Sequence, residues 1–215
     1  MNGAQLAGIG RRCHNARVTS APTHLLYLHG FRSSPQSFKA QRLARVVQSM
    51  QAEGQGLIWC CPQLPPSPQQ TMAELRALTQ HWPTESMVVI GSSLGGFYAT
   101  ALAQERGCRF AVINPAVQPA RDLARHIGEQ ASFHDPQSTF FFREEFIDQF
   151  RALDPFPVDH PERCWALIAE GDEVLDWREM VSHYQGARIH LLDGSDHAVS
   201  DFDEHLPTLL GWLFP

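Results

Sequence analysis

The sequence feature that most restricts the fold is a run of β-branched residues leading directly into a serine flanked by glycines. Val88-Val89-Ile90 is followed by Gly91-Ser92-Ser93-Leu94-Gly95, which matches the pattern G-x-S-x-G. Residues Phe97–Glu105 then place Leu and Ala at helical spacing. Because β-branched residues favour strands, this segment predicts a buried strand, a sharp turn and a helix.

The rest of the chain repeats this alternation of short apolar runs and helix-period segments. It predicts an α/β-hydrolase fold with a mostly parallel sheet of about six to seven strands and helices on both faces. The predicted strands cover His24–His29, Leu57–Cys61, Met87–Gly91, Phe110–Asn114, Cys164–Ala169 and Arg188–Leu192, and the predicted helices cover Ser37–Ala52, Thr71–His81, Leu94–Glu105, Trp177–Tyr184 and Asp201–Leu213.

Two segments depart from the alternation. Residues 1–22 are rich in Gly, Ala and Arg and are expected to be a loosely ordered N-terminal extension, with residues 23–215 forming a single α/β-hydrolase domain. Residues 116–162 are rich in Phe and are expected to be a short helical, cap-like excursion beyond the carboxyl ends of the strands. It could act as a lid, or its aromatic residues could simply pack a small core of their own.

Ser93 is the candidate nucleophile. In a strand-turn-helix of this kind the serine lies in strained backbone, and Gly91 and Gly95 remove the side chains that would collide. A serine hydroxyl is a weak nucleophile that needs a base, and the anion formed when it adds to a carbonyl needs fixed donors. The alternative, a phosphate-binding glycine turn, lacks the Lys of a Walker motif.

A base and an acid are expected after the serine, each in the loop that follows a later strand. Of the 11 histidines, His197 is the one just past the last predicted strand. Three acids precede it. Asp176 begins a capping-box pattern that would occupy its carboxylate. Asp172 is favoured over Glu173, because it follows the Gly171 turn directly and its short side chain suits a rigid hold on an imidazole N–H.

Two backbone N–H groups are predicted to stabilise the oxyanion. The N–H of Leu94 lies at a helix start, where backbone donors are unpaired and the dipole favours negative charge. The second donor is expected from the loop after the first strand, where the N–H of Phe31 is the candidate. His29 in the same loop is expected to shape the loop rather than act as a second base.

Composition argues against several other classes of protein. Lys plus Arg number 17 against 23 Asp plus Glu, the net charge is -6, and no basic run is present, so nucleic acid is not an expected partner. The apolar runs are shorter than the roughly 20 residues of a membrane helix, and no signal core is evident, so no membrane span and a cytoplasmic location are expected. The five cysteines lack the spacing of zinc sites, so no metal is expected.

Several strings occur in a fixed order: Tyr27-Leu28-His29-Gly30-Phe31 with Ser33-Ser34-Pro35, Pro62-Gln63-Leu64-Pro65-Pro66, Gly91-Ser92-Ser93-Leu94-Gly95-Gly96, Asn114-Pro115-Ala116, Gly171-Asp172-Glu173-Val174-Leu175-Asp176 and Asp196-His197-Ala198. Together they resemble the YqiA/YcfP-like (UPF0227) family of small bacterial esterases in the α/β-hydrolase superfamily. The resemblance covers nearly everything from Leu25 onward, and only residues 1–22 and the Phe-rich segment depart from it.

The resemblance implies a cofactor-free serine esterase that acts on carboxylic esters or thioesters of small to medium acyl chains. Nucleophile, acid and base would fall on Ser93, Asp172 and His197, and the partner would be a small-molecule acyl ester or thioester. Two alternatives stay open. The same triad could serve an acyltransferase or a peptidase, or the chain could be a non-catalytic module that binds an acyl chain or a partner.

Overall fold

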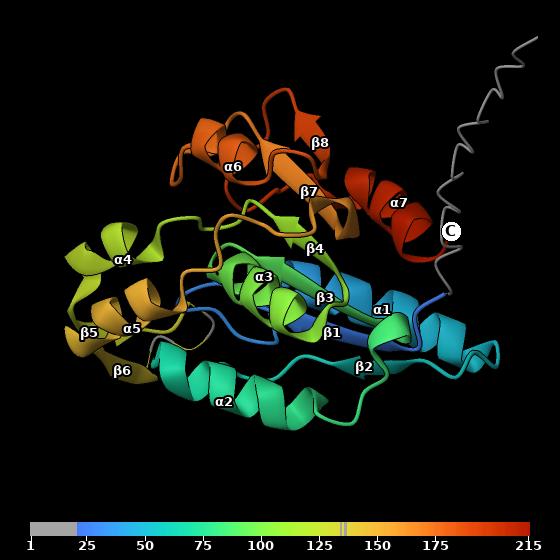
Figure 1. Cartoon of the computed structure of the whole chain (residues 1–215), viewed down its shortest axis with the longest axis horizontal. Helices are drawn as coiled ribbons and strands as arrows, with labels where there is room; N and C mark the ends of the chain where they lie inside the picture. The colour runs from blue at the N-terminus through green and yellow to red at the C-terminus, as the bar shows by residue number, and fades with distance from the viewer. Residues whose placement is uncertain (1–20, 134, 136) are drawn as a thin grey trace, which may run out of the picture.

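Six parallel strands form the central sheet, in the order β2-β1-β3-β4-β7-β8 (Figure 1). The computed structural model describes residues 21–133, 135 and 137–215, so the predicted extension 1–22 lies outside the described residues except for its last two. The predicted α/β-hydrolase fold is confirmed. The strands are β1 His24–Leu28, β2 Ile58–Cys60, β3 Met87–Ser92, β4 Arg109–Ile113, β7 Cys164–Ala169 and β8 Arg188–Leu192.

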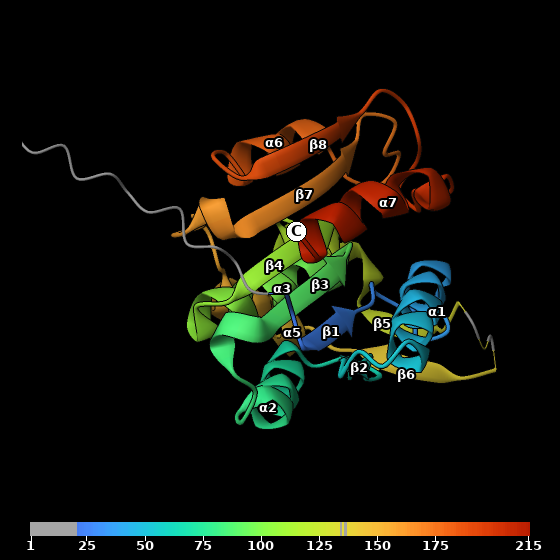
Figure 2. The same ribbon diagram turned by 90° about the vertical axis from the view of Figure 1, so that its right-hand side faces the viewer.

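Helices cover both faces of this sheet (Figure 2). α1 and α7 pack on one face, and α2, α3 and α6 pack on the other. These helices are α1 Phe38–Ala52, α2 Pro68–Thr79, α3 Leu94–Arg106, α6 Trp177–His183 and α7 Phe202–Leu213, and short 3-10 turns lie at η1 Thr84–Ser86, η2 Ala124–His126 and η3 Pro161–Arg163.

The apolar strands supply both cores because successive side chains point to opposite faces of a sheet. In β1, Leu26 and Leu28 pack towards α2 and α3, while Leu25 and Tyr27 pack towards α1 and α7. All four side chains are essentially fully buried. A strand covered on both faces therefore reads as an unbroken apolar run rather than an alternating one.

The helix before β3 begins earlier than its apolar spacing predicts. α2 starts at Pro68 rather than at Thr71. The Oγ atom of Ser67 accepts a hydrogen bond from the N–H of Gln70 at 3.2 Å, and proline suits the first helical position because it has no N–H to leave unpaired. Capping chemistry thus sets this boundary.

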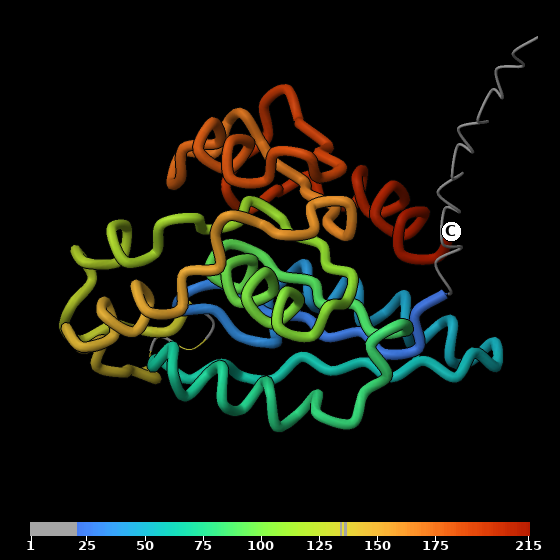
Figure 3. The backbone as a smooth tube through the Cα atoms, in the orientation of Figure 1, coloured from blue at the N-terminus to red at the C-terminus, as the bar shows by residue number. Residues whose placement is uncertain are grey.

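The Phe-rich segment leaves the sheet after β4 and returns at β7 (Figure 3). It contains helices, as expected, and also a two-stranded antiparallel pair that the sequence did not predict. Phe142, Phe146 and Phe150 are buried and join the core beside α3, whereas Phe133 and Phe141 are more than half exposed. Most of its aromatic residues therefore pack the core. Its elements are α4 Pro119–Asp122, β5 Gly128–Ala131, β6 Thr139–Phe142 and α5 Glu145–Leu153.

Within the described ranges, no helix combines the length and the apolar character needed to cross a bilayer.

Candidate active site

The turn between β3 and α3 holds Ser93 in the left-handed region of backbone space, at φ 55°. Strand and helix approach each other so closely here that a Cβ on Gly91 would lie 2.1 Å from the carbonyl oxygen of Gly95. A Cβ on Gly95 would lie 2.0 Å from the oxygen of Leu28 in β1. Both glycines are therefore required by contact, and the serine hydroxyl is displayed at the carboxyl end of the sheet.

The candidate nucleophile, base and acid come together in one chain of hydrogen bonds. Nε2 of His197 lies 3.1 Å from Oγ of Ser93, and Nδ1 of His197 lies 2.8 Å from Oδ2 of Asp172. A carboxylate only accepts hydrogen bonds, so the geometry places the ring proton on Nδ1 and leaves Nε2 to accept from the serine hydroxyl. Residues from the loops after β3, β7 and β8 thus meet at one edge of the sheet.

The acids that the sequence left as alternatives have separate partners. Asp172 has a fully buried side chain, and its Oδ1 atom accepts hydrogen bonds from the N–H groups of Val174 and Leu175 at 2.9 and 2.8 Å. Glu173 instead accepts from the backbone N–H of His197 at 2.9 Å. Asp176 caps α6 by accepting from a backbone N–H at 2.9 Å, as its capping-box pattern predicts. Of the three acids, Asp172 is the one in contact with the imidazole ring.

The loop that carries His197 is fixed by Asn114, which sequence reasoning did not single out for a site role. This buried amide donates to the backbone oxygens of Asp196 at 2.9 Å and His197 at 3.1 Å. Its own oxygen accepts from the N–H of Ala169 at 2.8 Å. Asn114 therefore joins the ends of β4 and β7 to the histidine loop. The available signal was a polar residue directly after an apolar strand, which must find partners if it is buried.

Lys39 contacts the same loop through a second hydrogen bond. Its ammonium group donates to the backbone oxygen of Ala198. Burial lowers the pKa of Lys39 to about 8, although the carboxylates of Asp196 and Asp172 oppose that shift. Its place in α1 gave no sequence signal, because the contact joins residues 159 positions apart.

The loop after β1 passes directly beside the serine. A Cβ on Gly30 would lie 3.1 Å from Cβ of Ser93. The next residue, Phe31, lines the same pocket as Ser93, Leu94 and His197. Leu94 is the first residue of α3, so its N–H has no acceptor within that helix. Both predicted oxyanion donors thus belong to residues that lie around the hydroxyl.

His29 links this loop to the one after β2. Its ring is buried, and Nε2 accepts a hydrogen bond from the N–H of Leu64 at 3.1 Å. The contact holds the two loops together, which agrees with the loop-shaping role expected from the sequence.

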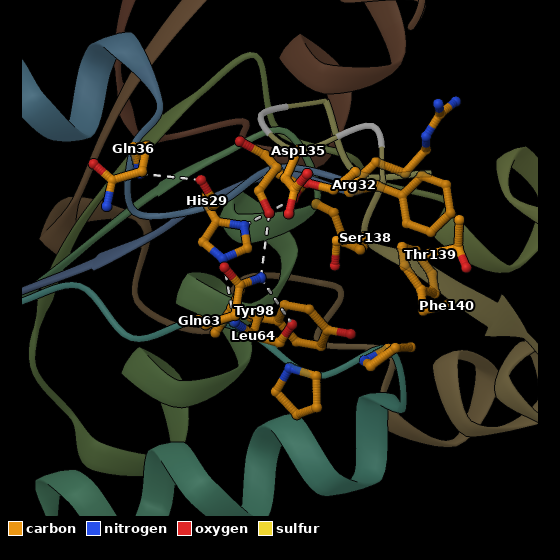
Figure 4. Close-up of a pocket in the computed structure, with 18 residues that line it drawn as sticks. His29, Arg32, Gln36, Gln63, Leu64, Tyr98, Asp135, Ser138, Thr139 and Phe140 are labelled. Atoms are coloured by element: carbon orange, nitrogen blue, oxygen red, sulfur yellow. Dashed lines mark hydrogen bonds between the residues drawn. The ribbon is translucent and has the colours of Figure 1, made fainter. Parts of the chain in front are cut away.

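Two cavities lie on either side of Phe31 and Leu94. The first, of about 250 Å³, contains Ser93 and His197 and reaches under residues of α4 and η2. The second, of about 460 Å³, lies between the loops after β1 and β2 and the segment that joins β5 to β6 (Figure 4). Polar side chains of Gln63 and Asp135 line this larger cavity. Phe31, Arg32 and Leu94 form the wall that both cavities share.

Among the residues that the structure places, no group of three or more His, Cys, Asp and Glu side chains is arranged to hold a metal ion. Burial raises the pKa values of the thiols of Cys60, Cys61, Cys108 and Cys164, so these cysteines disfavour the reactive thiolate form.

Comparisons with known proteins identify the family and the fold. The family model described as "Uncharacterised protein family (UPF0227)" matches residues 24–213. A UPF0227 protein of Yersinia pseudotuberculosis is 24% identical over 143 residues, which are 64% of this chain and 71% of the relative.

Solved structures with the same fold include alpha/beta hydrolase domain-containing protein 10 from mouse, which has a TM-score of 0.66 and 16% identity over 90% of this chain and 92% of its own. A structure described for LipS and LipT, two metagenome-derived lipolytic enzymes, has a TM-score of 0.65 and 18% identity over 91% of this chain and 95% of its own. At these identities the likeness shows the α/β-hydrolase fold alone.

Proposed function

The chain belongs to the uncharacterised protein family UPF0227, as its sequence strings predicted, and from the geometry of its site we propose that it is a serine hydrolase. It cleaves carboxylic esters or thioesters of small to medium acyl chains through an acyl-enzyme. The observation that carries the proposal is the hydrogen-bonded chain from Asp172 through His197 to Ser93.

The reaction has two steps in this proposal. His197 takes the hydroxyl proton as Ser93 attacks the carbonyl carbon, and the N–H groups of Phe31 and Leu94 stabilise the oxyanion. The carbon–oxygen or carbon–sulfur bond then breaks, and the proton passes from His197 to the departing alcohol or thiol. Water repeats the sequence on the acyl-enzyme, which releases the acid and restores the hydroxyl.

The burial of Asp172 supports its assignment as the acid. Oδ1 is held by two backbone N–H groups, so Oδ2 has a fixed position against Nδ1 of His197. A carboxylate held in this way keeps the imidazole in the tautomer that accepts from serine and stabilises the imidazolium that forms.

The size of the serine cavity supports small to medium acyl groups. Its volume of about 250 Å³ lies just below the roughly 300–1,000 Å³ that is usual for ligand pockets. The structural neighbours include lipolytic enzymes, so this fold carries ester hydrolysis in other chains.

A direct test measures p-nitrophenyl butyrate hydrolysis by the native chain and by Ser93→Ala, together with labelling by a fluorophosphonate probe, which reacts only with an activated serine. We expect a loss of rate of at least about a thousandfold in the variant, and labelling of the native chain alone. Native-like turnover by Ser93→Ala would overturn the proposal.

Labelling without hydrolysis, followed by acyl transfer to an added alcohol or amine, would favour an acyltransferase, and cleavage of peptides would favour a peptidase. An unlabelled but folded chain would favour the binding module.

A further inference from the structure

On the basis of the proposed ester or thioester hydrolysis, we propose that the substrate carries an anionic group, a carboxylate or a phosphate, which Arg32 and Arg125 bind in the cavity beside Ser93. The inference assigns a substrate class and two specificity residues to that site.

Both arginines line the cavity that contains the hydroxyl and the imidazole. Arg32 lies next to Phe31 in the loop after β1, and Arg125 lies in the 3-10 turn η2 of the Phe-rich segment. The two guanidinium groups therefore reach the cavity from segments far apart in the sequence.

Neither arginine is neutralised by an acid. Among the described residues, no Asp or Glu oxygen lies within 4.0 Å of either guanidinium group, whereas six other arginines have such an acidic partner. Asp122 also lines the cavity, but its carboxylate is paired with Arg121, whose Nε donates to Oδ1 at 2.8 Å, and its Oδ2 atom is buried without a hydrogen-bond partner. The cavity thus keeps uncompensated positive charge.

Arg32 is held in place for binding. Its Nε atom donates to the backbone oxygen of Ala131 at 2.7 Å, and its guanidinium carbon lies 4.4 Å from the centre of the Phe133 ring. In Figure 4 this side chain extends away from His29 and Gln63. One edge of the planar group is thereby fixed, and the terminal nitrogens have the fork geometry that suits a carboxylate or phosphate.

His126 reports the positive potential at the same place. Its pKa is lowered first by burial and then by the charges of Arg125 and Arg32. The lowered pKa favours the neutral ring, whose Nε2 atom accepts a hydrogen bond from Nε of Arg125 at 3.3 Å, so the two arginines are left as the cations that line the cavity. The whole chain has a net charge of -6, so this local positive charge runs against the overall balance and would draw an anion to the cavity.

The remaining walls of the cavity suit an apolar body. Leu123, Val174 and Leu175 line it together with the Phe133 ring. The substrate that fits is therefore an acyl ester or thioester with an apolar part near the serine and a negatively charged group within reach of the arginines.

Matched pairs of esters test this class. The acyl side is tested with p-nitrophenyl hemiadipate against p-nitrophenyl heptanoate. The leaving-group side is tested with para-acetoxyphenylacetate and para-acetoxybenzylphosphonate, each against para-tolyl acetate. The readout is the anionic-to-neutral ratio of kcat/KM within each pair, so that differences in general reactivity cancel between protein variants.

We expect Arg32→Gln and Arg125→Gln each to lower this ratio by about tenfold for at least one pair, mainly through KM, because a hydrogen bond to a charged group is lost. Arg143→Gln is the matched control. Arg143 is exposed on the same Phe-rich segment, pairs with Glu145 at 3.3 Å and does not line the cavity. The anionic-to-neutral ratio of this variant should therefore stay within about twofold of the native ratio. Added salt should lower the native ratio as well.

Ratios that change less than about twofold in both arginine variants, for every pair, would overturn the inference while leaving the hydrolase proposal intact. If no ester is hydrolysed, the hydrolase proposal fails separately, and calorimetry decides the inference. Adipate monoamide and benzylphosphonate should then bind the Arg125→Gln variant more weakly than they bind the native chain, and equal binding would count against the arginines.

Discussion

The buried amide of Asn114 donates a hydrogen bond to the backbone oxygen of His197, 83 positions later in the chain, at 3.1 Å. The same side chain accepts from Ala169 at the end of β7, two residues before the turn that leads to Asp172. One residue at the end of β4 therefore sets the spacing between the loops that carry the imidazole and the carboxylate.

Replacing Asn114 with Ala should destabilise the fold by about 2–3 kcal/mol, because the buried N–H of Ala169 loses its acceptor and a cavity is left. Urea denaturation measures the change. The variant should also label more slowly with a fluorophosphonate under conditions where it is fully folded, since His197 is less well placed. Native stability together with a native labelling rate would contradict the positioning role.

Asp172→Asn should reduce ester turnover by roughly a thousandfold to ten-thousandfold, because an amide can donate to the imidazole and favour the wrong tautomer. Glu173→Gln is the matched control. Its amide oxygen can still accept from the N–H of His197, so turnover should fall less than about tenfold. Steady-state kinetics on p-nitrophenyl butyrate measures the loss of turnover in each variant. A larger loss in Glu173→Gln than in Asp172→Asn would assign the role of the acid to Glu173.

Gly95→Ala should prevent native folding, because the new methyl group would lie 2.0 Å from the backbone oxygen of Leu28. Gly211→Ala provides the comparison within α7, where a Cβ meets nothing within 4 Å. That change should raise stability by about 0.5–1 kcal/mol through helix propensity. Thermal melts of the two purified variants test both statements, and a soluble, native-like Gly95→Ala chain would disagree with the close strand–helix contact.

Lys39 should make stability depend on pH in alkaline solution. Burial lowers its pKa in the folded state to about 8, below the ordinary lysine value of 10.5. Below pH 8 both states hold the proton and the cost of the buried ammonium is fully present. Between pH 8 and pH 10.5 Lys39 is protonated more often in the unfolded state than in the folded state, so the free energy of unfolding should rise with pH.

The measurement is the difference in unfolding free energy between the native chain and Lys39→Gln, followed from pH 7 to pH 10.5 by urea denaturation. Subtracting the variant removes the contributions of the other titrating groups. A difference that is flat or falls with pH would contradict the lowered pKa.

Local sequence patterns predicted the sheet well because its strands are buried on both faces and its helices carry regular apolar spacing. β7 and β8 match their predicted bounds, and α1, α3, α6 and α7 differ from theirs by a single residue at one or both ends. The short strands β5 and β6 were not predicted. Gly128–Ala131 is neither apolar nor alternating, and Thr139–Phe142 becomes a strand only by pairing with it.

The order of Ser93, Asp172 and His197 could be predicted because each lies in the loop or turn after a strand, and the carboxyl ends of parallel strands meet at one edge. Asn114 and Lys39 could not be assigned, because their contacts join distant segments whose separation in space depends on the finished fold. The same holds for Arg32 and Arg125, which approach one cavity from different segments.

Ser93, Asp172 and His197 lie in loops after different strands, β3, β7 and β8, so their positions depend on how these strands pair. A chain in which β8 has not yet joined β7 would hold hydroxyl, imidazole and carboxylate apart, even if β3 and α3 had already formed their sharp turn. Under the proposed function, the residues from β7 onward complete the site, so a nascent or truncated polypeptide that lacks them should not hydrolyse esters.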